Sequence, residues 1–214
     1  MATKYWGPLG WMTLHSISVC YPELPSDADK AILIRFLERF QETISCPQCK
    51  KHFSTMFANY KQVHPEWANT RFDLFLMICR IHNTVNLRLD KPRFSSVKEC
   101  LSALTNATKL NSQSVFRNGY LTYLYKNWIK EQSGEGFIMV GAVKEMMKIN
   151  TEYWNLRNVD FDKVVFLAEA DVLERVKDDP RNMTVNPAIP FFSDGKIPSV
   201  GFKLSGGRLR LGGK

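Results

Sequence analysis

The chain has few cysteines, few histidines and no long apolar run. It holds 5 cysteines and 4 histidines among 214 residues. No segment approaches the roughly 20 consecutive apolar residues of a membrane helix. The first residues, Met1 to Trp6, also lack the apolar core of a signal peptide. We therefore expect a soluble protein that is not secreted by the ordinary route and does not bind membranes. Five cysteines are also too few for the disulfide framework of a secreted protein.

Basic residues outnumber acidic ones, with 29 Lys and Arg against 21 Asp and Glu, which gives a formal net charge of +8. A basic surface attracts phosphates without regard to sequence. Here, however, the charges are spread along the chain, and the one local cluster lies in residues 206–214. We interpret that cluster as a mobile, solubilising tail, and we do not expect nucleic acid as a partner.

The cysteine pair Cys46-Pro47-Gln48-Cys49 is the most informative motif of the chain. Two thiols at this spacing can close a small disulfide and so accept or give electrons. Pro47 suits the first turn of a helix, so the positive end of that helix would lie at Cys46 and favour its thiolate. The motif alone leaves two other interpretations open, half of a zinc site or a pair of buried thiols.

Apolar residues recur every three or four positions through the first half of the chain and predict five helices. We expect them at residues 8–21, 26–44, 46–60, 70–89 and 95–105. On the fourth, the residues Phe72, Phe75, Cys79, His82 and Asn86 would share one face. This half therefore predicts a compact all-α bundle.

The second half is expected to be a smaller domain. A polar run at 111–114 reads as a linker and divides the chain into domains at 1–110 and 111–214. Helical spacing recurs at 121–129, 137–153 and 164–176, and an irregular tail is expected from Pro180 onward. This half has no cysteine and no histidine. Redox or metal chemistry is therefore not centred there.

Two constellations compete for the cysteines. The first is a four-ligand zinc site formed by Cys46, Cys49, Cys79 and His82, which would make the chain a non-catalytic binding module. Against zinc, Cys79 and His82 lie inside a long apolar helix, and the domain has enough apolar residues to fold without metal. We expect no bound metal. A thioredoxin-like exchanger is a third possibility, but it needs a βαβ frame that the sequence does not show.

The second constellation uses residues that zinc would not explain. They lie in the segments Trp6-Gly7-Pro8-Leu9-Gly10-Trp11-Met12-Thr13-Leu14-His15 and His82-Asn83-Thr84-Val85-Asn86, the latter followed by Lys91-Pro92. Aromatic and imidazole rings can stack on a flat heterocycle, amides can bind its edges, and lysine can meet a phosphate. Together they predict a cofactor held inside the bundle.

These motifs resemble the Erv/ALR family of FAD-linked sulfhydryl oxidases, and in particular its giant-virus, mimivirus-like members. The resemblance covers residues 6–100. It rests on Trp11-x-x-x-His15, Tyr21-Pro22, Cys46-Pro-Gln-Cys49 with His52-Phe53, and His82-Asn83-x-Val85-Asn86-x-x-Leu89-x-Lys91-Pro92. It implies a four-helix bundle plus a short fifth helix that binds FAD, followed here by a second, mostly helical domain and an irregular C-terminal tail.

The resemblance also implies which residues form the catalytic and cofactor site. The catalytic pair would be Cys46 and Cys49. The FAD-binding residues would be Trp6, Gly10, Trp11, His15, His52, His82, Asn83, Asn86 and Lys91. Protein thiols or a thioredoxin-like carrier would reduce the pair, and dioxygen would receive the electrons with release of hydrogen peroxide. A homodimer is expected and, for a viral protein, a location in the host cytoplasm and the virion.

The family's structural disulfide between the fourth and fifth helices has an altered spacing here. Cys79 stands where the first half belongs, whereas the second half would be expected near Ser96 and the chain offers Cys100 instead. Four residues make about one helical turn, so the same face is still presented. We expect a Cys79–Cys100 bridge. Cys20 would then be the free thiol.

Overall fold

The computed structural model describes residues 3–109, 112–178, 202–205 and 208–211. Five helices make up the first half, namely α1 (Thr3–Cys20), α2 (Asp27–Thr43), α3 (Pro47–Val63), α4 (Arg71–Arg88) and α5 (Val97–Thr108). All five predicted helices are therefore confirmed, with ends that differ by a few residues. Helix α1 begins more than a turn before Pro8 and continues through it. Burial of Trp6 stabilises this additional turn.

Side-chain caps define where several of these helices begin. The Ser26 hydroxyl accepts a hydrogen bond from the Asp29 N–H at 3.2 Å, while the Asp29 carboxylate accepts one from the Ser26 N–H at 2.9 Å. Thr70 caps α4 and Ser96 caps α5 in the same way. Each cap satisfies backbone donors that have no partner inside the helix.

The second half adds helices α6 (Gln113–Trp128) and α7 (Gly134–Glu152) and two short 3₁₀ helices, η1 (Trp154–Arg157) and η2 (Phe161–Lys163). Helix α6 begins two turns earlier than predicted, within the expected linker. The reason is that its first turns are buried through residues such as Phe116 and Arg117. Residues 110 and 111 lie outside the described part of the chain.

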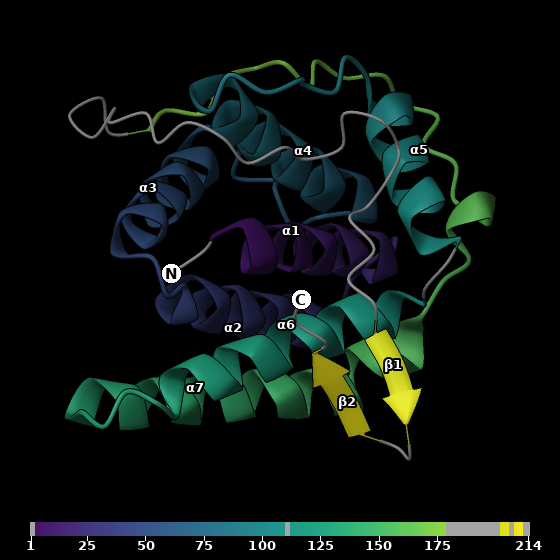
Figure 1. Ribbon diagram of the computed structural model, residues 1–214. Coiled ribbons are helices and arrows are strands. Elements are labelled where there is room, and N and C mark those ends of the chain that lie inside the picture. The colour runs from purple at the N-terminus through teal and green to yellow at the C-terminus, as the bar shows by residue number, and fades with distance from the viewer. Residues whose placement is uncertain (1–2, 110–111, 179–201, 206–207, 212–214) are drawn as a thin grey trace.

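The sequence predicts a helix at residues 164–176, and this prediction is wrong. Residues 164–178, which we call the strap, form neither helix nor strand, contain a turn at Val172 and Leu173, and run along the outside of α4 (Figure 1). Its backbone groups bond to side chains of α4. Asn83 donates to the carbonyl of Val172 and Arg80 to that of Asp171, while the Val176 N–H donates to Thr84. These bonds replace the internal ladder that a helix would have supplied.

The two halves share one hydrophobic core. Figure 1 shows α1 in the middle of the molecule, with α4 and α5 on one side and α6 and α7 on the other. Tyr120 and Leu124 of α6 and Val143 of α7 belong to the same buried cluster as Leu14 and Phe36 of the first half. The division into two domains at residue 110 stays a prediction.

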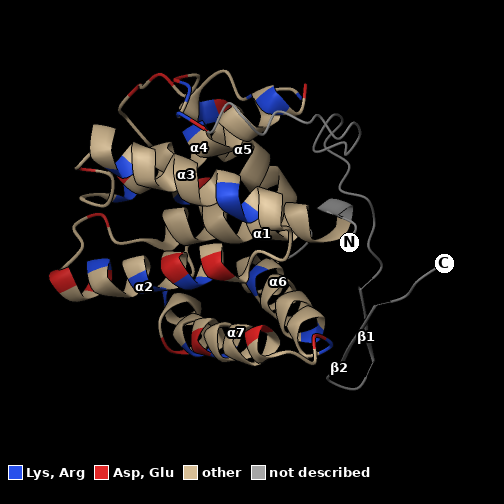
Figure 2. Ribbon diagram, turned by 90° about the vertical axis from the view of Figure 1, so that its left-hand side faces the viewer, with Lys and Arg blue, Asp and Glu red and all other residues tan. Residues whose placement is uncertain are grey.

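The all-α class is confirmed for the body of the chain. The expected irregular tail contains a strand pair instead, because β1 (Phe202–Ser205) and β2 (Arg208–Leu211) pair antiparallel with Lys203 opposite Arg210. The rest of the tail from Pro180 lies outside the described residues, whereas Arg208 and Arg210 of the basic cluster belong to β2. Among the described helices, none combines the length and apolar character that a membrane span requires. Figure 2 shows acidic and basic residues mingled along α2 and α7.

Candidate redox and cofactor site

The cysteine pair lies at the start of α3. Cys46 and Cys49 are joined by a disulfide, and both side chains are half-buried. Cys46 is the N-cap of α3, with its sulfur accepting a hydrogen bond from the Cys49 N–H at 3.2 Å, and Pro47 occupies the first helical position. The positive end of α3 therefore faces Cys46, which stabilises a thiolate there once the disulfide is reduced.

A cluster of rings from α1 and α4 forms the second part of the site. Trp11 stacks on His82 with 4.0 Å between ring centroids and an interplanar angle of 5°. The Nε2 atom of His15 lies 2.9 Å from Nδ1 of His82, and both imidazoles are buried. Phe94 closes the cluster edge-on to both imidazoles. Residues 67 positions apart thus meet because α1 packs against α4.

Burial keeps the His82 imidazole of this cluster uncharged. Burial lowers the pKa of His82 well below its usual value, and the nearby His15 and Lys91 lower it further. His82 is therefore a neutral imidazole at pH 7, which suits stacking and hydrogen bonding. Burial also lowers the pKa of the half-buried Lys91.

The predicted amides on α4 have different surroundings. The Asn86 side chain donates to the carbonyl of Pro92 at 3.0 Å, and the Lys91 N–H donates to the Asn86 backbone carbonyl, so these two residues are tied together beside His82. Both N–H groups of the Asn83 amide, and one acceptor site of its oxygen, bind protein backbone. The amide donates to the carbonyls of Phe94 and Val172 and accepts from the Phe94 N–H, each at 2.9 Å.

The remaining predicted cofactor residues are spread more widely. Trp6 is buried on α1, and its indole N–H has no hydrogen-bond partner among the described residues. His52 is buried on α3, three residues after Cys49. Gly10 lies on the face of α1 that meets α6, where a Cβ atom would come within 3.3 Å of the Tyr120 ring. The structure therefore groups Trp11, His15 and His82 closely and turns Gly10 away toward α6.

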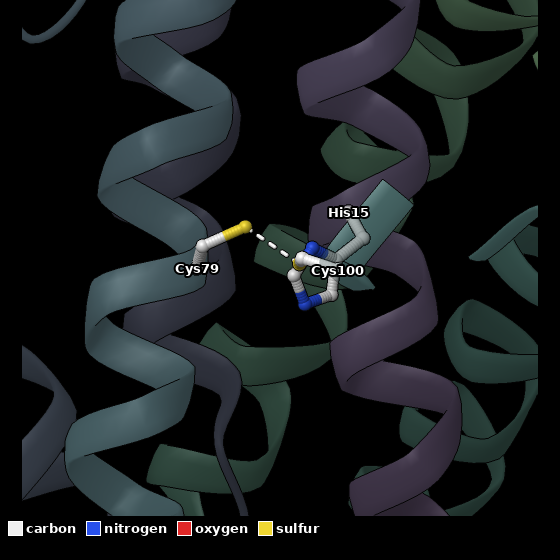
Figure 3. A group of neighbouring side chains, drawn as sticks. All are labelled: His15, Cys79 and Cys100. Atoms are coloured by element: carbon white, nitrogen blue, oxygen red, sulfur yellow. Dashed lines mark hydrogen bonds between the residues drawn. The ribbon is translucent and has the colours of Figure 1, made fainter. Parts of the chain in front are cut away.

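Two further side chains, Cys79 and Cys100, meet His15 at the edge of the ring cluster (Figure 3). The sulfurs of Cys79 and Cys100 lie 2.6 Å apart as free thiols, and His15, Cys79 and Cys100 have ligand atoms all within 4.8 Å of one another. Burial and the neighbouring Cys100 raise the pKa of Cys79. The altered cysteine spacing therefore still brings both sulfurs into contact, and the bridge stays a prediction.

We expect alkylation of the unfolded, unreduced protein to label one cysteine, Cys20, and alkylation after reduction to label all 5 cysteines. The reason is that a bridge between Cys79 and Cys100, added to the one between Cys46 and Cys49, leaves a single free thiol. Intact-mass spectrometry measures both numbers. Labelling of three cysteines without reduction would show that Cys79 and Cys100 are not bridged.

The structure does not assemble the zinc alternative. Cys46 and Cys49 are bonded to each other, and the sulfur of Cys79 faces Cys100 rather than that pair. Within the described residues, the group with metal-ligand geometry is His15, Cys79 and Cys100. Cys46, Cys49, Cys79 and His82 are therefore not arranged around a single metal position.

Sequence reasoning missed the strap as a neighbour of the site. Glu174 binds Arg80 at 2.7 Å and His64 at 2.8 Å, and Phe166 packs on Phe75, whose ring in turn packs on His15. Only the alternating acidic and apolar residues around Val172 could have hinted at an extended segment. They could not have indicated that α4 was its partner.

The ring cluster fits FAD by the chemistry of its groups. A stacked indole and neutral imidazole suit a flat heterocycle, the buried indole N–H of Trp6 has no hydrogen-bond partner among the described residues, and the half-buried Lys91 suits a phosphate. The structure is thus a helical bundle with a reducible disulfide at the start of one helix and a cluster of rings in its interior. This combination is typical of an all-α redox protein.

The comparisons with known proteins agree with this class. Residues 9–104 match the Erv1 / Alr family. The chain is 32% identical over 88 residues to the FAD-linked sulfhydryl oxidase of African swine fever virus (isolate Tick/Malawi/Lil 20-1/1983), with 41% of this chain and 70% of that protein covered. It is 33% identical over 88 residues to the mitochondrial FAD-linked sulfhydryl oxidase ERV1 of Saccharomyces cerevisiae, covering 41% of this chain and 44% of the yeast protein.

A probable FAD-linked sulfhydryl oxidase of Acanthamoeba polyphaga mimivirus is 27% identical over 86 residues, with 40% of this chain and 59% of the mimivirus protein covered. The chain thus spans about half the length of several curated relatives that it matches. No solved structure is a significant match. From the match to the viral oxidase, of which the chain covers 70%, the chain belongs to the Erv1/Alr family.

Proposed function

We propose that this chain is a flavin-dependent thiol oxidase that forms disulfides in substrate proteins. The observation that carries the proposal is the half-exposed Cys46–Cys49 disulfide at the start of α3, in the same helical bundle as the stack of the partly buried Trp11 on the buried His82. The names of the relatives, as FAD-linked sulfhydryl oxidases, support the same activity. Two substrate thiols and one dioxygen would give one disulfide and one hydrogen peroxide.

The cysteines would carry the exchange. A substrate thiolate attacks the sulfur of Cys46, a new S–S bond forms, and the bond to Cys49 breaks so that Cys49 leaves as a thiolate. A second substrate thiolate then attacks the mixed disulfide and releases Cys46, whose negative charge is stabilised by the positive end of α3. The substrate has gained a disulfide, and the pair holds two electrons.

FAD, when bound, would supply a two-electron acceptor for this pair and pass the electrons to dioxygen. Trp11 and His82 would hold its rings, and Lys91 would meet its phosphates, with Trp6, His15 and Asn86 as further contacts. Because all three hydrogen bonds of Asn83 go to protein backbone, we propose that Asn83 positions the loop and strap around this site. Because His15 and His82 are both buried, they would keep water away from their side of the site.

Protein thiols, or a thioredoxin-like carrier that delivers their electrons, are the proposed reductants. We also propose a homodimer and, for a viral protein, a location in the host cytoplasm and virion, which the viral relatives support. Packing of α6 against α1 and of α7 against α2 covers one side of these two helices, so a second copy would have to use other surfaces.

The purified protein is expected to be yellow, with flavin absorption bands, and to consume oxygen when dithiothreitol is added in air. Visible absorption and an oxygen electrode measure the two properties together. A protein that stays colourless after incubation with FAD, and that consumes no oxygen, would contradict the proposed function.

A further inference from the structure

Two helix ends of opposite sign meet at the redox disulfide. Helix α2 ends at Thr43, and α3 begins with Cys46 as its N-cap. Carbonyl groups without partners make the C-terminal end of a helix negative, whereas free N–H groups make the N-terminal end positive. Three Cα steps of about 3.8 Å each keep Thr43 within about 11 Å of Cys46. Once the disulfide is reduced, a thiolate on Cys46 is therefore favoured by α3 and disfavoured by α2.

The negative end of α2 is compensated by hydrogen bonds rather than by charge. A basic side chain in the last turn is a common way to stabilise such an end, and α2 has none there. The Thr43 hydroxyl donates to the carbonyls of Arg39 at 2.8 Å and Phe40 at 3.2 Å. The carbonyl of Thr43 accepts a hydrogen bond from the indole N–H of Trp128 at 2.9 Å. Helix α6 thus binds the α2 carbonyl that is nearest in sequence to Cys46.

Helix α6 contacts the end of α2 at two further points. Tyr120 packs on Phe40, with 5.1 Å between ring centroids. Burial raises the pKa of Tyr123, and its interaction with the side chain of Ser45 opposes that rise, so Tyr123 lies against the residue that precedes Cys46. Both residues of α6 lie beyond the part of the chain that matches the family. The second half of the chain therefore holds the backbone that leads into the redox pair.

We propose that Trp128 is a positioning residue for the redox pair, whose N–H holds the end of α2 and offsets the negative charge there, so that a thiolate on Cys46 is stabilised. This inference deepens the proposed function, on which it rests, because it assigns a residue of the second half to the catalytic pair. A disulfide whose reduced form is stabilised is a stronger oxidant. The Trp128 N–H therefore makes the Cys46–Cys49 disulfide easier for substrate thiols to reduce.

The variant Trp128→Phe removes the N–H and keeps an aromatic ring. Trp128 is only partly buried, so we expect this variant to fold. The control is Trp154→Phe, because the same change is made there in a fully buried indole of η1 whose N–H has no hydrogen-bond partner among the described residues. A loss of packing alone would therefore affect the control at least as much as the test variant.

The measurement is the redox equilibrium of the pair with glutathione. Each protein, with its flavin, is equilibrated without oxygen in mixtures of glutathione and glutathione disulfide. Two glutathione thiols reduce the Cys46–Cys49 disulfide to two thiols and become one glutathione disulfide, so the electrons balance. Acid quenching, alkylation and peptide mass spectrometry then give the reduced fraction of the pair in each mixture. Circular dichroism confirms that each variant is folded.

For Trp128→Phe we expect the equilibrium constant for reduction by glutathione to fall about threefold or more, the effect of one lost hydrogen bond. The control should leave the constant unchanged. An unchanged constant in Trp128→Phe, or an equal fall in both variants, would overturn the role of Trp128 while leaving the oxidase intact. Absence of dithiothreitol oxidation in the unsubstituted protein would instead overturn the proposed function, and the glutathione equilibrium would still test Trp128 because it needs no oxygen.

Discussion

Substitution of Cys49 by serine is expected to abolish turnover with dithiothreitol, by about 10³-fold or more, while the protein keeps its flavin. Serine cannot form the disulfide that accepts the substrate's electrons, so Cys46 remains a thiol and no electrons reach the cofactor by the proposed route. The fold should survive, because the lost disulfide closes a loop of only four residues and constrains the unfolded chain little. Oxygen uptake and flavin absorption on the same sample measure both effects.

The matched control is Cys20→Ser. Cys20 is buried, and its thiol donates to the Gln113 side chain at 2.9 Å, a bond that a serine hydroxyl can also make. This variant should keep both flavin and turnover. Continued peroxide production by Cys49→Ser would refute the role assigned to Cys49, whereas loss of flavin from that variant would place Cys49 in the structure of the cofactor site.

Arg117→Ala is expected to destabilise the protein by about 3–5 kcal/mol, because it removes a fully buried side chain that joins four elements. The guanidinium donates to Ser16 of α1, Asn150 of α7 and Asn155 of η1, and also to Asn158. Burial lowers the pKa of Arg117, and the nearby Cys20 opposes that effect. Removing the side chain leaves a cavity and takes a donor from the buried oxygens of Ser16 and Asn150.

Thermal unfolding followed by circular dichroism measures this effect, and the midpoint should fall by about 10 °C or more. Arg35→Ala is the control, because Arg35 binds Glu145 across an exposed surface where an ion pair contributes little. Its midpoint should remain near that of the unsubstituted protein. A similar small change for Arg117→Ala would show that the second half is not held to α1 by this residue.

The sequence predicts the parts of this structure that depend on local chemistry. Ser26 and Pro47 indicate where α2 and α3 begin, and the spacing of Cys79 and His82 places them on one face of α4, where they do meet Cys100 and Trp11. Cap and periodicity signals act within one or two turns of a helix, so a single chain is enough to recognise them.

What the sequence could not predict depends on partners far along the chain. Helical spacing at 164–176 is misleading because the side chains of Arg80 and Asn83 bind backbone carbonyls of a segment that is not helical. Likewise, nothing near Gly10 indicates that Tyr120 occupies the space beside it. These long-range contacts place the strap beside α4 and α6 beside α1. The periodicity of apolar residues carries no information about them.

The central position of α1 has a consequence for how the chain folds during synthesis. His15 contacts His82, 67 residues later, and Ser16 contacts Arg117, 101 residues later. Helix α1 is synthesised before α4 and α6, its partners on opposite sides, so its apolar surface stays uncovered until both have been made. Contacts of such long sequence separation slow folding and favour association with other chains. The nascent protein would depend on chaperones until α6 and α7 emerge.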